Sequence, residues 1–272
     1  MSKFFRIHLP FARAGVQETI TYRTNFIFFM LGDLLKCIVA FFLWVAVFDS
    51  SGKGVFQGFT MQDMVLYIFI TFLTSYLTNS DGAWLIADEI RDGSIAMRLI
   101  KPIKFDMPLL FQELGGKIIS LYLVFVPAVL GVEIYRWVTT GSLQFKIGWF
   151  LLYLVSIALA YLIDFYFNLC FGFFAFLTKY MWGLQMVKGC IIGFLSGAVI
   201  PLQFMPAAIS GVLKFLPFAS LSYTPVMIYM GKYSLLDSFL LILYQGFWVV
   251  FFIVLSKFIW HFISKHLSVQ GG

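Results

Sequence analysis

Residues 87–106, ADEIRDGSIAMRLIKPIKFD, form a charged stretch inside an otherwise apolar chain. They hold a quarter of the charged side chains in a 272-residue sequence that is 61% hydrophobic and 12% charged. A soluble domain is about half apolar and about a quarter charged. The chain around this stretch is therefore too apolar for a soluble domain, and the stretch itself has to lie outside the apolar surroundings that the rest requires.

On either side of the charged stretch, apolar residues come in six long runs. A helix needs about 20 mostly apolar residues to cross a bilayer. The sequence therefore predicts an all-α membrane protein, a single transmembrane domain over residues 1–272 with six transmembrane helices. The predicted spans are residues 26–48, 61–79, 110–132, 148–177, 185–201 and 238–261.

The N-terminal residues 3–23 predict an amphipathic helix. Their apolar residues recur at the spacing of one helix face, whereas the charged residues take other positions. The apolar positions are Phe5, Leu9, Ala12, Val16 and Ile20. A basic amphipathic helix is typical of a segment that lies in the membrane interface. The alternative is a cytosolic helix packed on a partner.

Lysine and arginine residues in the connections and near the span ends predict the orientation, because cytoplasmic loops are enriched in them. With six spans, both termini and the charged stretch share one side, which carries twelve Lys and Arg residues, Lys188 and Lys257 near span ends included, against five on the other. Lys36 and Lys117, within or at the edge of spans, are left out of this count. We therefore expect cytoplasmic termini and a cytoplasmic loop over residues 83–105. The formal net charge of +6 follows from this placement and does not indicate nucleic acid binding.

Residues 202–237 are too apolar for a solvated loop and too broken for a span. Half of the eight prolines fall in or next to this segment, at Pro201, Pro206, Pro217 and Pro225. Broken backbone is tolerated at membrane depth only where protein or water satisfies its polar groups. We expect an external re-entrant element of short helices before the last span. The alternative is a surface loop without a special role.

Three charged residues within the predicted spans are candidates for a function. Asp33 and Lys36 share a helix face in the first span and can pair, whereas Asp164 has no charged neighbour in the fourth span. A charged residue costs about 2.5–3.5 kcal/mol near the bilayer centre, so its presence is a functional hypothesis. For Asp164 the alternative is a hydrogen bond to a neighbouring helix or subunit.

The remaining motifs indicate packing rather than chemistry. Gly189, Gly193 and Gly197 recur every fourth residue, a spacing that predicts a close helix contact inside the subunit or between subunits. The three cysteines lie in apolar segments without metal-ligand spacing. No phosphate loop or zinc-protease motif occurs in the sequence. We expect no enzymatic activity, metal site or cofactor on this chain.

The charged stretch itself predicts two short helices. Gly93 can take the left-handed conformation that ends a helix, Ser94 can cap a second helix, and Pro102 would end that helix. Its apolar residues Ile95 and Leu99 are one turn apart. A short helix with an apolar ridge at the cytoplasmic face fits a groove of another protein. The alternative is a solvated loop on lipid headgroups.

Two motifs in this chain together resemble the permease subunits of ATP-binding-cassette (ABC) transporters of type two, the exporter branch. The first is WLIADEIRDGSIAMRLIKPI at 84–103, and the second is SGAVIPLQFMP followed by LPFASLSYTPVMIYMG within 196–231. The resemblance covers essentially the whole chain and implies that the first motif is the coupling helix. The expected coupling residues are Glu89, Ile90, Arg91, Asp92, Gly93, Ile95, Arg98, Leu99 and Pro102, with Glu89 and Arg98 at the rim of the contact.

The resemblance also implies partners. Two permease subunits, identical or related, would form the pathway in a bacterial plasma membrane, in contact with lipid, and two separate ATPase subunits would bind ATP and Mg²⁺. Two other classes are considered: a secondary transporter or channel, and a membrane scaffold. A secondary transporter usually has broken segments in both halves, whereas only the second half of this chain has one.

Overall fold

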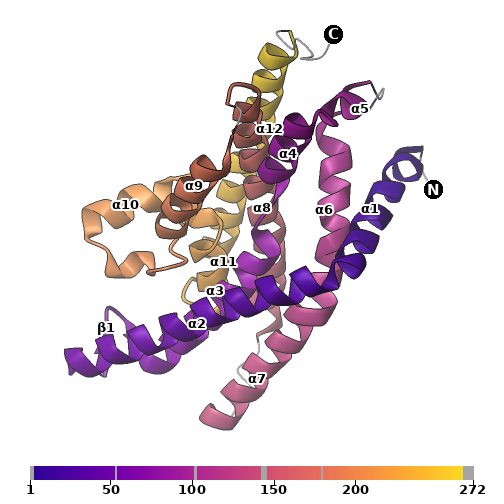
Figure 1. The fold of residues 1–272 in the computed structure, drawn as a ribbon. Coiled ribbons are helices and arrows are strands. Elements are labelled where there is room, and N and C mark those ends of the chain that lie inside the picture. The colour runs from indigo at the N-terminus through magenta and orange to yellow at the C-terminus, as the bar shows by residue number, and fades with distance from the viewer. Residues whose placement is uncertain (1–2, 53, 101–102, 142–145, 179, 266–272) are drawn as a thin grey trace.

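The structure is a computed structural model that describes residues 3–52, 54–100, 103–141, 146–178 and 180–265. The described chain is almost entirely helical, with one two-stranded antiparallel hairpin (Figure 1). Its elements are α1 Lys3–Thr21, α2 Arg23–Ser51, β1 Val55–Phe56, β2 Phe59–Thr60, α3 Met61–Thr78, α4 Gly82–Asp92, α5 Ile95–Leu99, α6 Asp106–Ser120, η1 Leu121–Phe125, α7 Val126–Thr140, α8 Ile147–Gly172, η2 Phe173–Phe176, α9 Trp182–Leu195, η3 Leu202–Phe204, α10 Ala207–Phe215, η4 Pro217–Ser220, α11 Tyr223–Tyr229 and α12 Leu235–Ser264.

Four helices in the described part of the chain are long and apolar enough to cross a membrane. They are Arg23–Ser51, Asp106–Val138, Ile147–Phe176 and Leu235–Ser264. These four contain or closely match the predicted spans 26–48, 110–132, 148–177 and 238–261. The other two predicted spans correspond to α3, with 18 residues, and α9, with 14 residues. Six transmembrane helices therefore remain a prediction.

The second of these long helices, Asp106–Val138, contains a π-helical turn, η1, between α6 and α7. Val126 N donates to Leu121 O, five residues earlier. Pro127 follows directly, and a proline inside a helix removes one backbone donor and collides with the carbonyl four residues before it. A widened turn at this point is one of the recognised ways in which a helix accommodates such a residue. The helix then continues past the predicted end at residue 132 to Thr140.

Helix α8 is the central element of the fold. It contacts α3, α4, α11 and α12. Half of the residues in its most apolar 18-residue stretch are buried. Two hydrophobic clusters meet along it. The first surrounds Tyr67, Tyr153 and Tyr223, and the second surrounds Phe165, Phe173 and Leu109. Helix α8 therefore connects the two halves of the core.

The segment predicted as re-entrant consists of short helices, as expected from its prolines. Pro206 precedes α10, Pro217 begins η4 and Pro225 lies in the first turn of α11, where the missing N–H of proline costs little. Pro201 precedes η3. Every residue of α11 is buried, so this part is core rather than surface loop.

Helix α1 crosses α6 at very short distance. A Cβ added to Gly115 would lie 2.0 Å from Ala12 O, and one added to Gly15 would lie 1.9 Å from Gln112 O. Only glycine at both positions permits this approach. Helix α1 is therefore attached to α6 of its own chain, and its predicted apolar face is divided: Leu9, Ala12 and Val16 are partly buried, whereas Phe5 and Ile20 are exposed.

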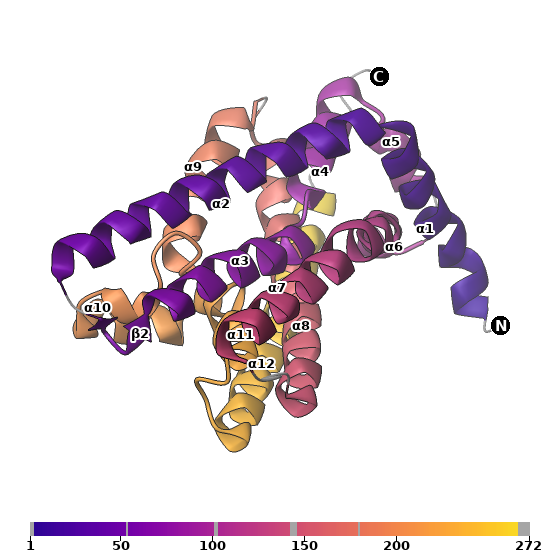
Figure 2. The ribbon, with the colours of Figure 1, turned by 90° about the horizontal axis from the view of Figure 1, so that it is seen from below.

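Different elements lie at the two ends of the molecule. The first turns of α1, the short helix α5 and the last turns of α12 lie toward the upper end in Figure 1, and the end of α7 and the β1 hairpin lie toward the lower end. Seen from below, α2 runs along one edge of the molecule (Figure 2). Helix α2 packs mainly on α3. Only 6% of the residues in its most apolar 18-residue stretch are buried.

Candidate functional site

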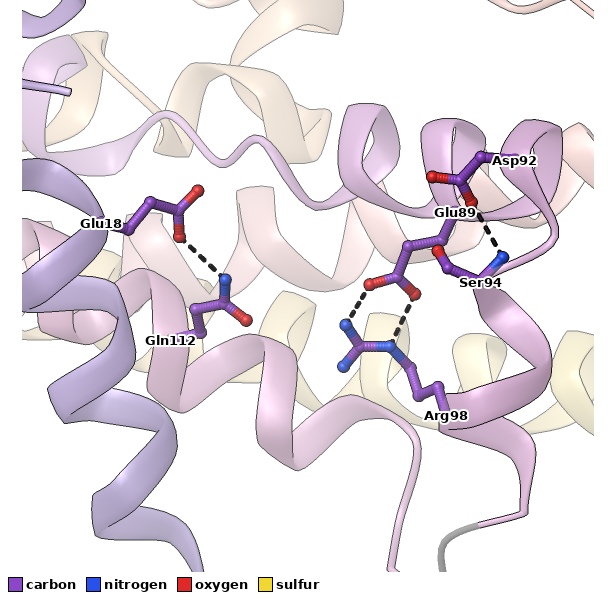
Figure 3. Close-up of polar contacts among 6 residues, drawn as sticks. All are labelled: Glu18, Glu89, Asp92, Ser94, Arg98 and Gln112. Carbon is purple, nitrogen blue, oxygen red and sulfur yellow. Dashed lines mark hydrogen bonds and ion pairs between the residues drawn. The ribbon is translucent and has the colours of Figure 1, made fainter. Parts of the chain in front are cut away.

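The α4–α5 segment, residues 82–99, has the two-helix form that the sequence predicts. Gly93 closes α4 in the left-handed conformation, with φ of 80°, which confirms its predicted role. The predicted cap is wrong: the Ser94 side chain makes no capping bond to α5. Instead, Ser94 N donates to Asp92 Oδ1 at 2.8 Å (Figure 3). Hydrogen bonds from the Ser94 side chain and backbone lower the pKa of the Asp92 carboxyl below its usual range.

A bidentate ion pair joins the two short helices. Arg98 Nε donates to Glu89 Oε2 at 2.8 Å, and Arg98 Nη2 donates to Glu89 Oε1 (Figure 3). The two side chains are only 14% and 17% exposed, and the guanidinium also lies 5.9 Å from the Phe105 ring centroid. Forked, partly desolvated pairs of this kind are among the stronger polar contacts. These residues brace α5 against α4, and their predicted place at the rim of a partner contact stays a prediction.

The apolar ridge predicted for docking is largely used inside the chain. Ile95 is buried, with 9% of its surface exposed, and Leu99 is half-buried. The exposed apolar side chains of this segment are Met97 at 61% and Ile100, next to α5, at 74%. The sequence predicted the short helix, but the spacing of Ile95 and Leu99 alone does not show that Ile95 is covered by its own chain.

The other predicted coupling residues take two kinds of position. Ile90 packs against the core around α8, whereas Arg91 is exposed and pairs with Asp88 at 3.0 Å. Asp92 and Gly93 form the exposed turn. Pro102 lies outside the described residues. Beyond it, Phe105 stacks on Trp260 at 4.4 Å and contacts Phe173 at 5.7 Å between ring centroids, which anchors the far end of the segment to α12 and η2.

Asp164 has the buried polar partners that the sequence could not name. Its Oδ2 accepts from Ser80 N at 2.7 Å and from Asn168 Nδ2 at 3.0 Å. Ser80 lies in the junction, residues 79–81, between α3 and α4. The alternative of a hydrogen bond to a neighbouring element is therefore the observed one, and the partner is the backbone that leads into the α4–α5 segment.

Two residues of α6 that sequence reasoning missed contact the same junction. Glu113 Oε1 accepts from Ser80 Oγ at 3.0 Å, and its Oε2 accepts from Tyr161 OH at 3.2 Å. Lys117 Nζ donates to Tyr76 O at 3.3 Å and to Asn79 O. A signal was present, since Glu113 and Lys117 are four residues apart and face the same side of a predicted span.

The Asp33–Lys36 pair forms as predicted. Lys36 Nζ lies 2.8 Å from Asp33 Oδ1 on α2. Lys36 is largely exposed, and the pair contacts neither the junction nor the α4–α5 segment within the described contacts. Nothing in this geometry adds a chemical role to the pair.

The predicted glycine stripe is corrected by the structure. Helix α9 ends at Leu195, so the span predicted to reach residue 201 is too long, and Gly197 lies beyond it at φ of 78°. Tyr67 OH donates to Gly197 O at 2.7 Å. Within the described chain, a Cβ added to Gly189 would meet nothing within 4 Å. Gly189 and Gly193 therefore do not hold two helices of this chain together, and a contact with another subunit stays a prediction.

An apolar cavity of about 680 Å³ lies between α2, α3 and α7. Its walls include Leu34, Phe41, Phe69, Phe72 and Val132. Such a lining accepts hydrocarbon, and the polar side-chain groups in it are the Cys37 thiol and the Tyr135 hydroxyl. Across the described residues, no group of three or more His, Cys, Asp or Glu side chains is arranged to hold a metal ion.

The fold and the site define a multi-pass α-helical membrane protein with a braced pair of short helices at one end. Over residues 34–271 the chain matches the family described as ABC-2 family transporter protein, and it belongs to that family. The resemblance to this family found in the sequence is thereby confirmed, and the chain is a membrane component of an ABC transporter. No curated protein matches the chain.

Proposed function

We propose that this chain is the transmembrane subunit of an ATP-driven exporter. It forms the substrate pathway with a second identical or related permease, and separate ATPase subunits, which bind ATP and Mg²⁺, dock on the α4–α5 segment. Six helices cross a bacterial plasma membrane, with α3 and α9 as the shorter two and both termini in the cytoplasm. An 18-residue helix spans about 27 Å, close to the roughly 30 Å of a hydrocarbon core.

The observation that carries this proposal is the shape of the α4–α5 segment. Met97 and Ile100 project from a short helix that is internally braced by Glu89 and Arg98. The sequence on either side of them carries exposed charged residues, including Arg91 and Lys104. A rigid apolar tip with a charged rim suits the groove of a protein partner, since hot spots are buried anchors surrounded by weaker contacts.

Co-purification with the ATPase tests the proposal. Burying each apolar side chain contributes about 1.5–3 kcal/mol, so a Met97→Asp, Ile100→Asp double variant should lose most of the bound ATPase and its ATP hydrolysis. Val55→Asp, at an equally exposed apolar position on β1, is the control and should retain both. Membrane expression is matched across the variants, and the ATPase is identified by its own phosphate-loop sequence in mass spectrometry.

Two results would contradict the proposal. If the wild-type chain purified from its native membrane never carried an ABC ATPase, the chain would not be coupled in this way. If the double variant retained the ATPase as fully as Val55→Asp, docking would use another surface.

A further inference from the structure

The junction between α3 and α4 is held by charged side chains of two other helices. Lys117 of α6 binds Tyr76 O and Asn79 O at the end of α3. Asp164 of α8 binds Ser80 N, and Glu113 of α6 binds Ser80 Oγ, just before α4 begins. We call Glu113, Lys117 and Asp164 the junction clamp.

The signs of these charges match the helix ends that they contact. The last carbonyls of a helix carry partial negative charge and the first N–H groups carry partial positive charge. Lys117 provides a cation at the end of α3, whereas Asp164 and Glu113 provide anions at the start of α4. Ser80 Oγ also accepts a hydrogen bond from Gly82 N, the first residue of α4, at 3.2 Å. Lys117 therefore satisfies carbonyls at the end of α3, and Ser80, which Asp164 and Glu113 hold, satisfies Gly82 N at the start of α4.

The charges bind the junction rather than each other. Among the described residues, no ion pair joins Lys117 to Glu113 or Asp164 within 4.0 Å. Asp164 and Ser80 are buried. A free carboxylate or ammonium at this depth would be costly, so each charge gains its stabilisation from a junction that stays in place.

Both ends of the α4–α5 segment are thus fixed to the spans. The clamp holds its beginning to α6 and α8, and Phe105, between Phe173 and Trp260, holds its far end. Asn168 extends the contact to α9, because Lys188 Nζ donates to its Oδ1 at 2.5 Å. Between these anchors, the Glu89–Arg98 pair prevents α5 from folding away from α4.

We propose that Glu113, Lys117 and Asp164 are positioning residues that make the α3–α4 junction rigid, so that movement of the α4–α5 segment is transmitted to α6 and α8. This inference rests on the proposed function for the origin of the movement, but the rigidity itself is a property of this chain alone. The three clamp residues lie on α6 and α8 and are not part of the proposed docking surface on the α4–α5 segment.

Amide hydrogen exchange in the purified transporter in lipid nanodiscs tests the clamp directly. In Asp164→Ala, the peptide covering residues 76–86 should exchange about tenfold faster or more, since a hydrogen bond to a charged group is lost. Asp164→Asn keeps an acceptor oxygen for Ser80 N and should stay near wild type. Asp237→Ala, which removes a carboxylate at the start of α12, is the control. Equal exchange of this peptide in all four proteins would overturn the clamp.

Ser80→Ala gives a milder second variant in case Asp164→Ala fails to fold. It removes the bond to Glu113 and the bond from Gly82 N, and it keeps the bond from Ser80 N to Asp164. We expect a partial loss of protection in the same peptide. Wild-type protection in Ser80→Ala would show that Glu113 does not help to hold the junction.

Transmission is tested in the complex with its ATPase. A bimane fluorophore on Leu130→Cys in α7, in a background without the native cysteines, reports a change on trapping with ATP and vanadate. Asp164→Ala should keep the ATPase and its hydrolysis but lose the fluorescence change, and Asp164→Asn should restore it. A full change in Asp164→Ala would overturn transmission through the clamp. If wild type bound no ATPase, the proposed function would fail, and the exchange experiment would still decide the clamp.

Discussion

The Glu89–Arg98 pair shows what a single contact does to the α4–α5 segment. Both residues are charged and lie on the short helices α4 and α5, and an exposed ion pair contributes only about 0–1 kcal/mol. The observed pair is different because it is forked and mostly covered. Its contribution is therefore closer to that of a hydrogen bond to a charged group, about 1.5–3 kcal/mol.

We predict that Arg98→Ala loosens α5 far more than Arg91→Ala. Arg91 pairs with Asp88 in an exposed position, so its loss should cost about 0–1 kcal/mol. Arg98→Ala instead removes both hydrogen bonds that Arg98 donates to the Glu89 carboxylate. Amide exchange of the peptide covering residues 94–100 measures the difference, and Arg98→Lys should recover part of the protection through one remaining bond. Indistinguishable exchange in the Arg91 and Arg98 variants would remove the brace from the mechanism.

Residue-level prediction from the sequence succeeded where the partner is local. Gly93 and the Asp33–Lys36 pair follow from backbone conformation and from spacing within one helix, and both are observed. It failed where the partner is distant in sequence. Ser80 and Asp164 are 84 residues apart, and no periodic pattern indicates that they meet.

At the scale of elements, hydropathy located the four long helices. It did not locate the end of the shorter helix α9. Residues 196–201 are as apolar as a span requires, yet α9 stops at Leu195. Tyr223 N donates to Ser196 O at 3.0 Å and Tyr67 OH donates to Gly197 O. These tertiary contacts take the carbonyls that a continuing helix would use. The end of α9 is therefore set by α3 and α11 together with the left-handed backbone of Gly197.

The closest helix contact in the fold was also missed, because the glycines responsible are on two different helices. Gly15 in α1 and Gly115 in α6 are not part of one stripe, and neither is informative alone. The stripe that the sequence did show, in α9, meets nothing within 4 Å of a Cβ added at Gly189 among the residues that the structure describes. Spacing of small residues thus predicts the ability to pack closely and not the partner.

We predict that Gly115→Ala separates α1 from α6. The added methyl would lie 2.0 Å from Ala12 O, a backbone atom that cannot rotate away, and such overpacking costs about 1–3 kcal/mol or more. A drop in the thermal unfolding temperature in detergent, together with faster exchange in α1, is expected. Gly32→Ala, where the methyl meets nothing within 4 Å, is the control. An unchanged α1 in Gly115→Ala would contradict the crossing.

For the whole molecule, the distribution of buried and exposed apolar residues gives the environment. Helix α8 is half buried, whereas α2 and α12 present rows of exposed Phe, Leu and Val side chains. Soluble monomers rarely expose apolar patches of this extent, so these faces contact lipid or a second subunit. The apolar cavity between α2, α3 and α7 opens on the same kind of surface. Membrane class could be read from composition alone, but the central place of α8 required the structure.

We finally predict the orientation of the molecule in the membrane. The basic residues of the sequence place both termini and the α4–α5 segment in the cytoplasm, and these parts lie toward one end of the molecule, away from β1 (Figure 1). Single cysteines at Asp88 and Ser264 should therefore resist an impermeant thiol reagent in intact cells and react after permeabilisation. Cysteines at Val55 and Lys146 should react from outside. All four positions are exposed, so accessibility within the protein cannot explain a difference. Labelling of Asp88→Cys or Ser264→Cys in intact cells, with Val55→Cys protected, would invert the orientation and place the α4–α5 segment where no ATPase could reach it.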